Sequence, residues 1–128
     1  IVRGIYCAVF EGIKAKAKPY AISIVDEYLE HARVMVFHNN GKNDMYISSA
    51  DWMVRNLDHR IEAACPVTDE ALKAEIIDIL NIQLSDTEKA RLLNKHLDNS
   101  YAATRNKKKV KSQIEIYRYL ARKKMASP

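Results

Sequence analysis

Two strand-like segments separated by a tight-turn sequence constrain the fold of this chain most strongly. Arg33–Phe37 and Met45–Ser49 are rich in β-branched and aromatic residues, which favour β-strands. Asn39, Asn40 and Gly41 lie between them, and these residue types tolerate the positive φ angles of hairpin turns. The pattern predicts an antiparallel β-hairpin.

The rest of the first half contains further strand-like segments and two helical patterns. Ile1–Phe10 predicts a buried strand that is followed by a lysine-rich loop, and Arg60–Val67 predicts another strand. The spacing of Ile22, Val25 and Leu29 predicts a helix from position 21 onward. A short turn of helix is predicted by Trp52, Met53 and Leu57.

The second half has the apolar spacing of helices. A helix of about four turns is predicted up to Leu84, with Thr68 able to cap its start. Ser85–Glu88 fits a capping box and predicts a shorter helix through Leu93. A final amphipathic helix is predicted from Ser112.

This order of elements predicts the fold class. Strands followed by helices predict an α/β or α+β domain, with a mixed sheet flanked by helices and a mostly helical C-terminal half. The 48% of hydrophobic residues, with only three glycines and three prolines, argues for a packed core and excludes a disordered tail or a collagen-like repeat. We expect residues 1–128 to form a single domain, and a fragment of a longer chain, because core-like residues already occur at Ile1 and no initiator methionine precedes them.

Charge and cysteine content narrow the possible partners and compartment. The formal charge of +5 and the pI of about 9.2 suit an anionic partner, whether nucleic acid, nucleotide, polyphosphate or a lipid surface. Cys7 and Cys65 form neither a zinc motif nor a disulfide framework, which favours a reducing cytoplasm. The sequence shows no apolar run long enough to span a bilayer and no secretory leader.

His31 and Arg33 are the first candidates for chemistry. They are two residues apart where the chain enters a strand, so both side chains should point to the same side. An imidazole exchanges protons near neutral pH and a guanidinium holds phosphate oxygens, a combination suited to phosphoryl transfer. An ordinary surface pair is the alternative interpretation.

A second candidate segment closes the hairpin. Ser48 and Ser49 offer hydroxyl groups to phosphate oxygens, and Asp51 offers a carboxylate that can orient an imidazole. The alternative is that the segment is a strand end, with Asp51 capping the turn that follows.

Several motifs together resemble one family. They are Arg3-Gly4-Ile5 with Cys7, Ser23–Val25, Glu30–Arg33, Ser48–Met53, Arg55–Asp58 with Arg60 and Glu62, and Ser85-Asp86 with Lys89–Arg91. In this order they resemble the C-terminal domain of the bacterial polyphosphate kinases of the phospholipase D-like type. The resemblance runs from Arg3 to about Tyr119.

The resemblance implies a fold and an activity. It implies the second of two phospholipase D-like domains in an enzyme that reversibly transfers the γ-phosphate of ATP to polyphosphate through a phosphohistidine in the preceding domain. His31 corresponds to a second active-site histidine with an acid/base or charge-stabilising role, and Arg3 to an arginine that contacts nucleotide phosphates. Mg²⁺ would accompany the nucleotide, with protein ligands outside these residues. The complete enzyme is expected to be a cytoplasmic homo-oligomer, with possible peripheral membrane association.

The sequence departs from the phospholipase D pattern at two positions. Arg33 replaces a lysine, which keeps the phosphate-binding charge, and His38 occupies an aspartate position, so it is interpreted as a hairpin residue only. The expected phosphate-binding set is Arg3, Arg33, Ser48 and Ser49. Asp51 and Glu30 are expected to orient these groups.

The remaining basic residues have two open interpretations. Arg55 and Arg60 could reach the transferred phosphate or pair with Asp58 and Glu62. The lysines of positions 14–18 and Lys107, Lys108 and Lys109 could guide polyphosphate or form solvated faces. No metal site is predicted.

Two other functions remain open at this stage. The first is a non-catalytic basic module that binds polyphosphate or nucleic acid, although nucleic acid is not the expected partner. The second is a phospholipase D-like phosphodiesterase.

Overall fold

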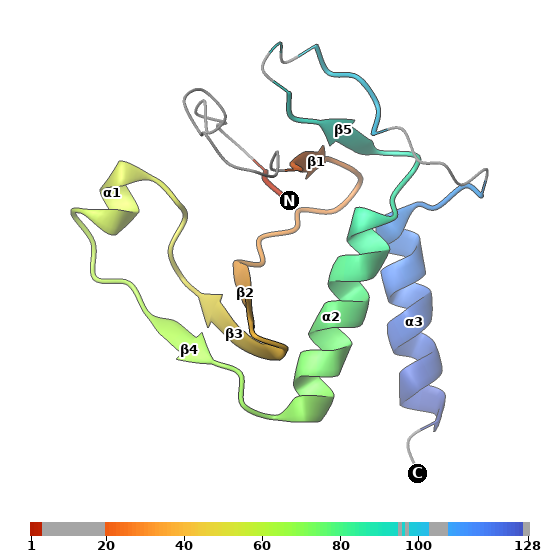
Figure 1. The fold of residues 1–128 in the computed structure, drawn as a ribbon. Coiled ribbons are helices and arrows are strands. Elements are labelled where there is room, and N and C mark those ends of the chain that lie inside the picture. The colour runs from red at the N-terminus through yellow and green to blue at the C-terminus, as the bar shows by residue number, and fades with distance from the viewer. Residues whose placement is uncertain (4–19, 95, 97, 103–107, 127–128) are drawn as a thin grey trace. The chain divides into compact units, whose positions relative to one another are not determined.

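The computed structural model describes residues 1–3, 20–94, 96, 98–102 and 108–126 (Figure 1). Most of the strand predicted at Ile1–Phe10, the lysine-rich loop after it and Lys107 lie outside the described residues. The chain divides into two compact units. The first unit comprises Ile1–Leu29 and Ile79–Pro128, and the second unit comprises Glu30–Asp78.

The second unit is built on the predicted hairpin. Strands β2 (Val34–Asn39) and β3 (Lys42–Ser48) pair antiparallel, and the turn between them has φ of 48° at Asn40 and 88° at Gly41. These positive angles match the turn geometry that follows the twist of the flanking strands. The prediction of a hairpin is confirmed.

A third strand and a short helix complete the sheet of this unit. Strand β4 (Ala64–Pro66) pairs antiparallel with β3, so the sheet order is β2-β3-β4. Helix α1 (Val54–Leu57) lies between β3 and β4 in the chain, as predicted. The strand expected over Arg60–Val67 is shortened to three residues.

The first unit contains a strand pair where two helices were predicted. Strands β1 (Ile22–Ile24) and β5 (Ala90–Leu92) pair antiparallel. The helix predicted from position 21 is wrong, because Ile22 and Ile24 are both buried whereas Val25 and Leu29 are exposed. Burial therefore follows the two-residue period of a strand.

The short helix predicted from Ser85 through Leu93 is also wrong. The Asp86 carboxylate accepts hydrogen bonds from the backbone amides of Glu88, Lys89 and Ala90, which turns the chain into β5. Pairing with β1 then buries Ala90 beside the two isoleucines of β1, in a small core completed by Ala102 and Leu92. Side-chain bonds to nearby amides compete in this way with helix formation.

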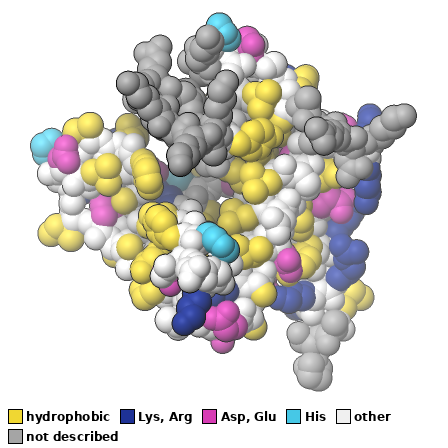
Figure 2. Space-filling model, in the orientation of Figure 1, with side chains coloured by type: hydrophobic (Ala, Val, Ile, Leu, Met, Phe, Trp, Pro, Cys, Tyr) yellow, Lys and Arg dark blue, Asp and Glu magenta, His cyan; other side chains and the backbone are white. Residues whose placement is uncertain are grey.

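Two long helices were predicted correctly. Helix α2 (Glu70–Leu84) begins after Asp69, whose Oδ1 accepts the Leu72 amide at 2.9 Å, so the cap is Asp69 and not Thr68. Helix α3 (Ser112–Ala126) is the predicted last helix. On the face seen in Figure 2, basic side chains gather along the side where α3 lies. None of the helices in the described part of the chain has the length and apolarity needed to span a bilayer.

The described elements confirm the mixed α/β class. Their strands form two separate antiparallel sheets, one of two strands and one of three.

Candidate functional site

The hairpin brings three of the candidate side chains together. Arg33 immediately precedes β2 and Asp51 follows β3, and the Ser48 amide donates to the Arg33 carbonyl at 2.9 Å, which extends the ladder to this end of the hairpin. The Arg33 Nε donates to Asp51 Oδ1 at 2.7 Å. The Arg33 Nη2 lies 2.7 Å from His31 Nε2. The structure thus forms a cluster of His31, Arg33 and Asp51, here called the His31 cluster.

Nε2 of the His31 imidazole has two polar neighbours, Arg33 and Asp51. A guanidinium only donates hydrogen bonds, so His31 Nε2 accepts from Arg33 when the ring is neutral, and the ring proton is then on Nδ1. His31 Nε2 also lies 3.7 Å from Asp51 Oδ1, which pairs with the ring when it is protonated. The His31 side chain is 65% exposed, so the ring is accessible to a ligand.

Arg33 and Asp51 hold each other in their charged forms. The hydrogen bond from Arg33, followed by the charges of Arg33, His31 and Arg55, keeps the pKa of Asp51 below its ordinary value against the effect of burial. The same bond raises the pKa of Arg33. The guanidinium is therefore a permanent cation whose orientation the carboxylate fixes. Asp51 does not cap the helix that follows, because the N-cap of α1 is Met53 and no side chain makes a cap hydrogen bond there.

The two serines of the site have internal partners. Ser48 Oγ accepts the Ala50 amide at 3.0 Å. Ser49 Oγ donates to Glu62 Oε2 and accepts the Ala63 amide at 3.0 Å. Ser49 would have to release Glu62 before it could donate to a phosphate.

A buried asparagine supports this arrangement and was missed by the sequence analysis. Asn56 is 3% exposed, and its Nδ2 donates to Glu62 Oε1 at 2.7 Å. The bonds from Ser49 and Asn56 lower the pKa of Glu62. Glu62 is thus bonded by these two residues, and Arg60 acts on it as a nearby charge. Asn56 lies within the Arg55–Asp58 motif, but its bond to Glu62 could not be inferred from the motif because it forms only in the folded loop.

The other predicted site residues are placed as follows. Glu30, partly buried, directly precedes His31 in the second unit. Arg3 is exposed and belongs to the first unit. Lys109 Nζ lies 3.9 Å from Glu88 Oε1, and Lys108 is exposed. His38 Nδ1 lies 3.4 Å from Asn43 Oδ1 across the hairpin.

The His31 cluster is a poor fit for a resident Mg²⁺ ion. Magnesium prefers oxygen ligands, and the one carboxylate of the cluster is committed to Arg33. Among the described residues, no group of three or more His, Cys, Asp or Glu side chains could hold a metal ion.

Fold and site together define the class: a mixed α/β domain that presents an imidazole, a guanidinium and a carboxylate to an exposed site at the end of a β-hairpin. Comparison with known families is consistent with this class. The sequence model for polyphosphate kinase C-terminal domain 2 matches residues 1–113, so the chain belongs to this family.

Individual relatives agree with this assignment. The polyphosphate kinase of Vibrio parahaemolyticus is 55% identical over 121 residues, and that of Escherichia coli K12 is 48% identical over 122 residues. Each match covers 94% of this chain and 17% of the relative. The crystal structure of the polyphosphate kinase from Porphyromonas gingivalis superposes with a TM-score of 0.82 at 50% identity, over 86% of this chain and 17% of that one. The chain therefore spans about one sixth of the length of these relatives, and the family predicted from its motifs is confirmed.

Proposed function

We propose that this chain contributes half of the phosphoryl-transfer site of a polyphosphate kinase. The complete enzyme would reversibly transfer the γ-phosphate of ATP to inorganic polyphosphate, through a phosphohistidine in the preceding domain. The His31 cluster is the observation that carries the proposal, since it places a proton-exchanging ring and an oriented cation side by side in a chain of this family.

The chemistry of phosphoryl transfer explains the need for these groups. The loose transition state spreads negative charge over the phosphoryl oxygens, so positioned cations lower its energy. Arg33, held by Asp51, would bind these oxygens with its free N–H groups, and Arg3 would bind nucleotide phosphates. His31 would give a proton from Nε2 to an oxygen of the leaving phosphate and take one back in the reverse direction. Mg²⁺ would screen the nucleotide charge, with its protein ligands outside this chain.

The wider setting belongs to the same proposal. ATP and polyphosphate are the partners, together with the preceding domains and further copies of the complete enzyme, whereas nucleic acid is not. Lys108 and Lys109 would guide the polymer. The exposed, unpaired thiol of Cys65 supports a reducing cytoplasmic location.

The division of the site between domains predicts that the isolated 128 residues transfer no phosphate. The covalent step needs a nucleophile in the preceding domain, so incubation with ATP and polyphosphate should show no labelled product above background. The complete enzyme provides the positive control. Robust transfer by the isolated chain would refute the division.

Asp51→Asn in the complete enzyme should lower kcat by about tenfold or more, because Arg33 loses its anchor and protonated His31 loses its counter-charge. Steady-state kinetics in both directions would measure this. Asp44→Asn is the matched control. Asp44 lies in the same hairpin, and its carboxylate accepts a hydrogen bond from Asn39 and not from a residue of the His31 cluster. Equal rates for Asp51→Asn and wild type would remove Asp51 from the site.

A further inference from the structure

A cavity of about 550 Å³ opens in the first unit, beside the strand pair β1-β5. This volume is within the roughly 300–1,000 Å³ of small-molecule sites. Three apolar side chains, Val25, Leu92 and Leu93, form part of its lining. The other lining residues are Ser23, Lys89, Arg91, Asn99 and Tyr101. The lining residues that the structure describes therefore include several hydrogen-bond donors and no carboxylate.

The two cations of the cavity are held in place by their neighbours. The Arg91 guanidinium carbon lies 3.3 Å from the centre of the Tyr101 ring, and Arg91 Nη1 donates to the Asn99 carbonyl at 3.1 Å. Lys89 is two residues earlier in the chain, and its Nζ lies 3.5 Å from Asp26 Oδ1. Donors that are already oriented bind an anion without a large loss of side-chain entropy.

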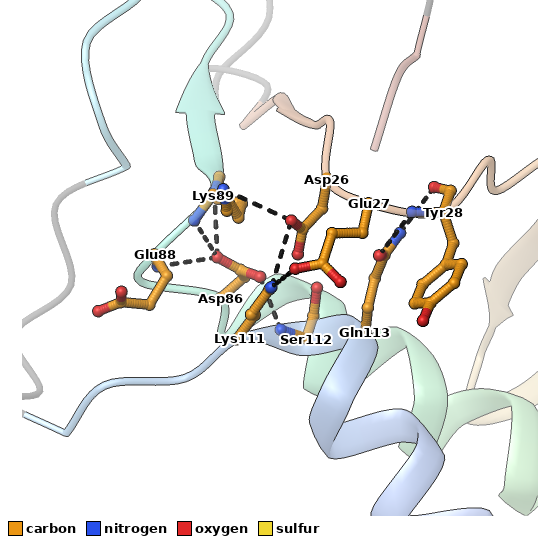
Figure 3. A network of polar contacts seen from close by, with 10 residues as sticks. Asp26, Glu27, Tyr28, Asp86, Glu88, Lys89, Lys111, Ser112 and Gln113 are labelled. Carbon is orange, nitrogen blue, oxygen red and sulfur yellow. Dashed lines mark hydrogen bonds and ion pairs between the residues drawn. The ribbon is translucent and has the colours of Figure 1, made fainter.

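The charges around the cavity leave one cation uncompensated. Asp26, whose side chain is 1% exposed, faces both Lys89 and Lys111, and Lys111 also donates to Glu27 at 2.5 Å (Figure 3). These two acids and two lysines balance one another. Among the described residues, Arg91 has no carboxylate within ion-pair distance and contacts only a ring and a carbonyl. The described lining of the cavity thus carries net positive charge.

We propose that this cavity binds a condensed phosphate, either a segment of inorganic polyphosphate or the phosphate tail of a nucleotide, as a site additional to the His31 cluster. Arg91 would bind phosphate oxygens with its remaining N–H groups, and Lys89 would add a second charge. The choice of phosphate over other anions rests on the proposed function, whereas the preference for an anion rests on the lining alone.

Titration calorimetry of the complete enzyme with sodium tripolyphosphate tests the proposal. Wild type should show an Arg91-dependent class of sites, and Arg91→Gln should weaken that class by about tenfold. Arg91→Lys, which keeps the charge, should retain part of the affinity. Ser23→Asp is a second variant that retains Arg91. Because Ser23 pairs directly with Arg91, this substitution places a carboxylate beside the guanidinium and should weaken binding at least as much as Arg91→Gln does.

Two controls separate this site from general electrostatics and from the proposed function. Lys124→Gln removes an exposed charge of α3 outside the cavity and should leave binding unchanged. A loss of affinity equal to that of Arg91→Gln would overturn the proposal.

His31→Ala should leave the Arg91-dependent class of sites intact, whether or not it affects turnover. If ATP displaces tripolyphosphate, the nucleotide tail is a ligand of the cavity. If ATP does not displace it, the ligand is polyphosphate. Displacement by adenosine, or unchanged binding in both cavity variants, would overturn the proposal.

Discussion

Replacement of His31 by alanine should lower the turnover of the complete enzyme by a factor of about 10² to 10⁴, the usual contribution of a general acid or base. The imidazole is the one group of the His31 cluster that can exchange a proton near neutral pH. Its side chain is 65% exposed, so its removal creates no cavity in the core. The melting temperature should therefore remain at the wild-type value while activity is lost.

His38→Ala provides the matched control for this experiment. His38 is an exposed histidine of the same hairpin that contacts Asn43, and its removal should leave turnover within about twofold. Initial rates of polyphosphate synthesis from ATP, measured for both variants, give the comparison. Near-normal rates for His31→Ala would exclude this ring from the mechanism.

Replacement of Asp86 by alanine should cost about 3 kcal/mol in the free energy of unfolding, because it leaves buried amides without acceptors. Asp86 is fully buried, and its carboxylate accepts four backbone amides: those of Glu88, Lys89, Ala90 and Ser112. The bond to Ser112, at 2.8 Å, ties the start of α3 to the turn before β5. Denaturant unfolding followed by circular dichroism would measure the loss.

The same carboxylate predicts acid sensitivity. Burial opposes its ionisation, but the hydrogen bonds of Lys89, Ser112 and Ala90 outweigh it and hold the pKa of Asp86 below the ordinary 3.8. The folded protein therefore binds this proton less readily than the unfolded chain does. The stabilisation is complete above pH 3.8 and disappears as the pH falls through the lower, folded value. Asp86→Ala should flatten the stability profile in that acid range.

Asp98→Ala is the control for Asp86. Asp98 also accepts a backbone amide, that of Ser100, and a side-chain amide, that of Asn94, but it is exposed. Water can replace its bonds, so a much smaller loss is expected. Equal losses at the two positions would show that the buried amides are not the source of the effect.

Features of this protein that rest on local interactions could be predicted from the sequence. The hairpin was predictable because Asn40 and Gly41 determine their own turn geometry. The contact between His31 and Arg33 was predicted from strand alternation, but both residues precede β2, so their closeness in the sequence and not a shared strand face brings them together. Once the hairpin register is set, Asp51 reaches Arg33 without any further long-range contact.

Interactions between distant residues were not predictable. Ser85–Glu88 has the composition of a capping box, but the Asp86 carboxylate binds nearby amides instead, and the chain then pairs as β5 with β1, nearly seventy residues earlier. The role of Asn56 likewise depends on the position of Glu62 in the folded loop. In both cases the local conformational preference is small in free energy. Contacts with a residue far along the chain therefore decide the native structure.

The sequence by itself determined the hairpin, the two long helices, the family and the neighbouring placement of an imidazole and a guanidinium, because each depends on local propensity or on motifs read along the chain. The tertiary structure alone decided the strand pair β1-β5, the burial of Asp86 and the cavity beside Arg91. These features arise from contacts between segments far apart in the chain, whose energies exceed the local preferences of the residues involved.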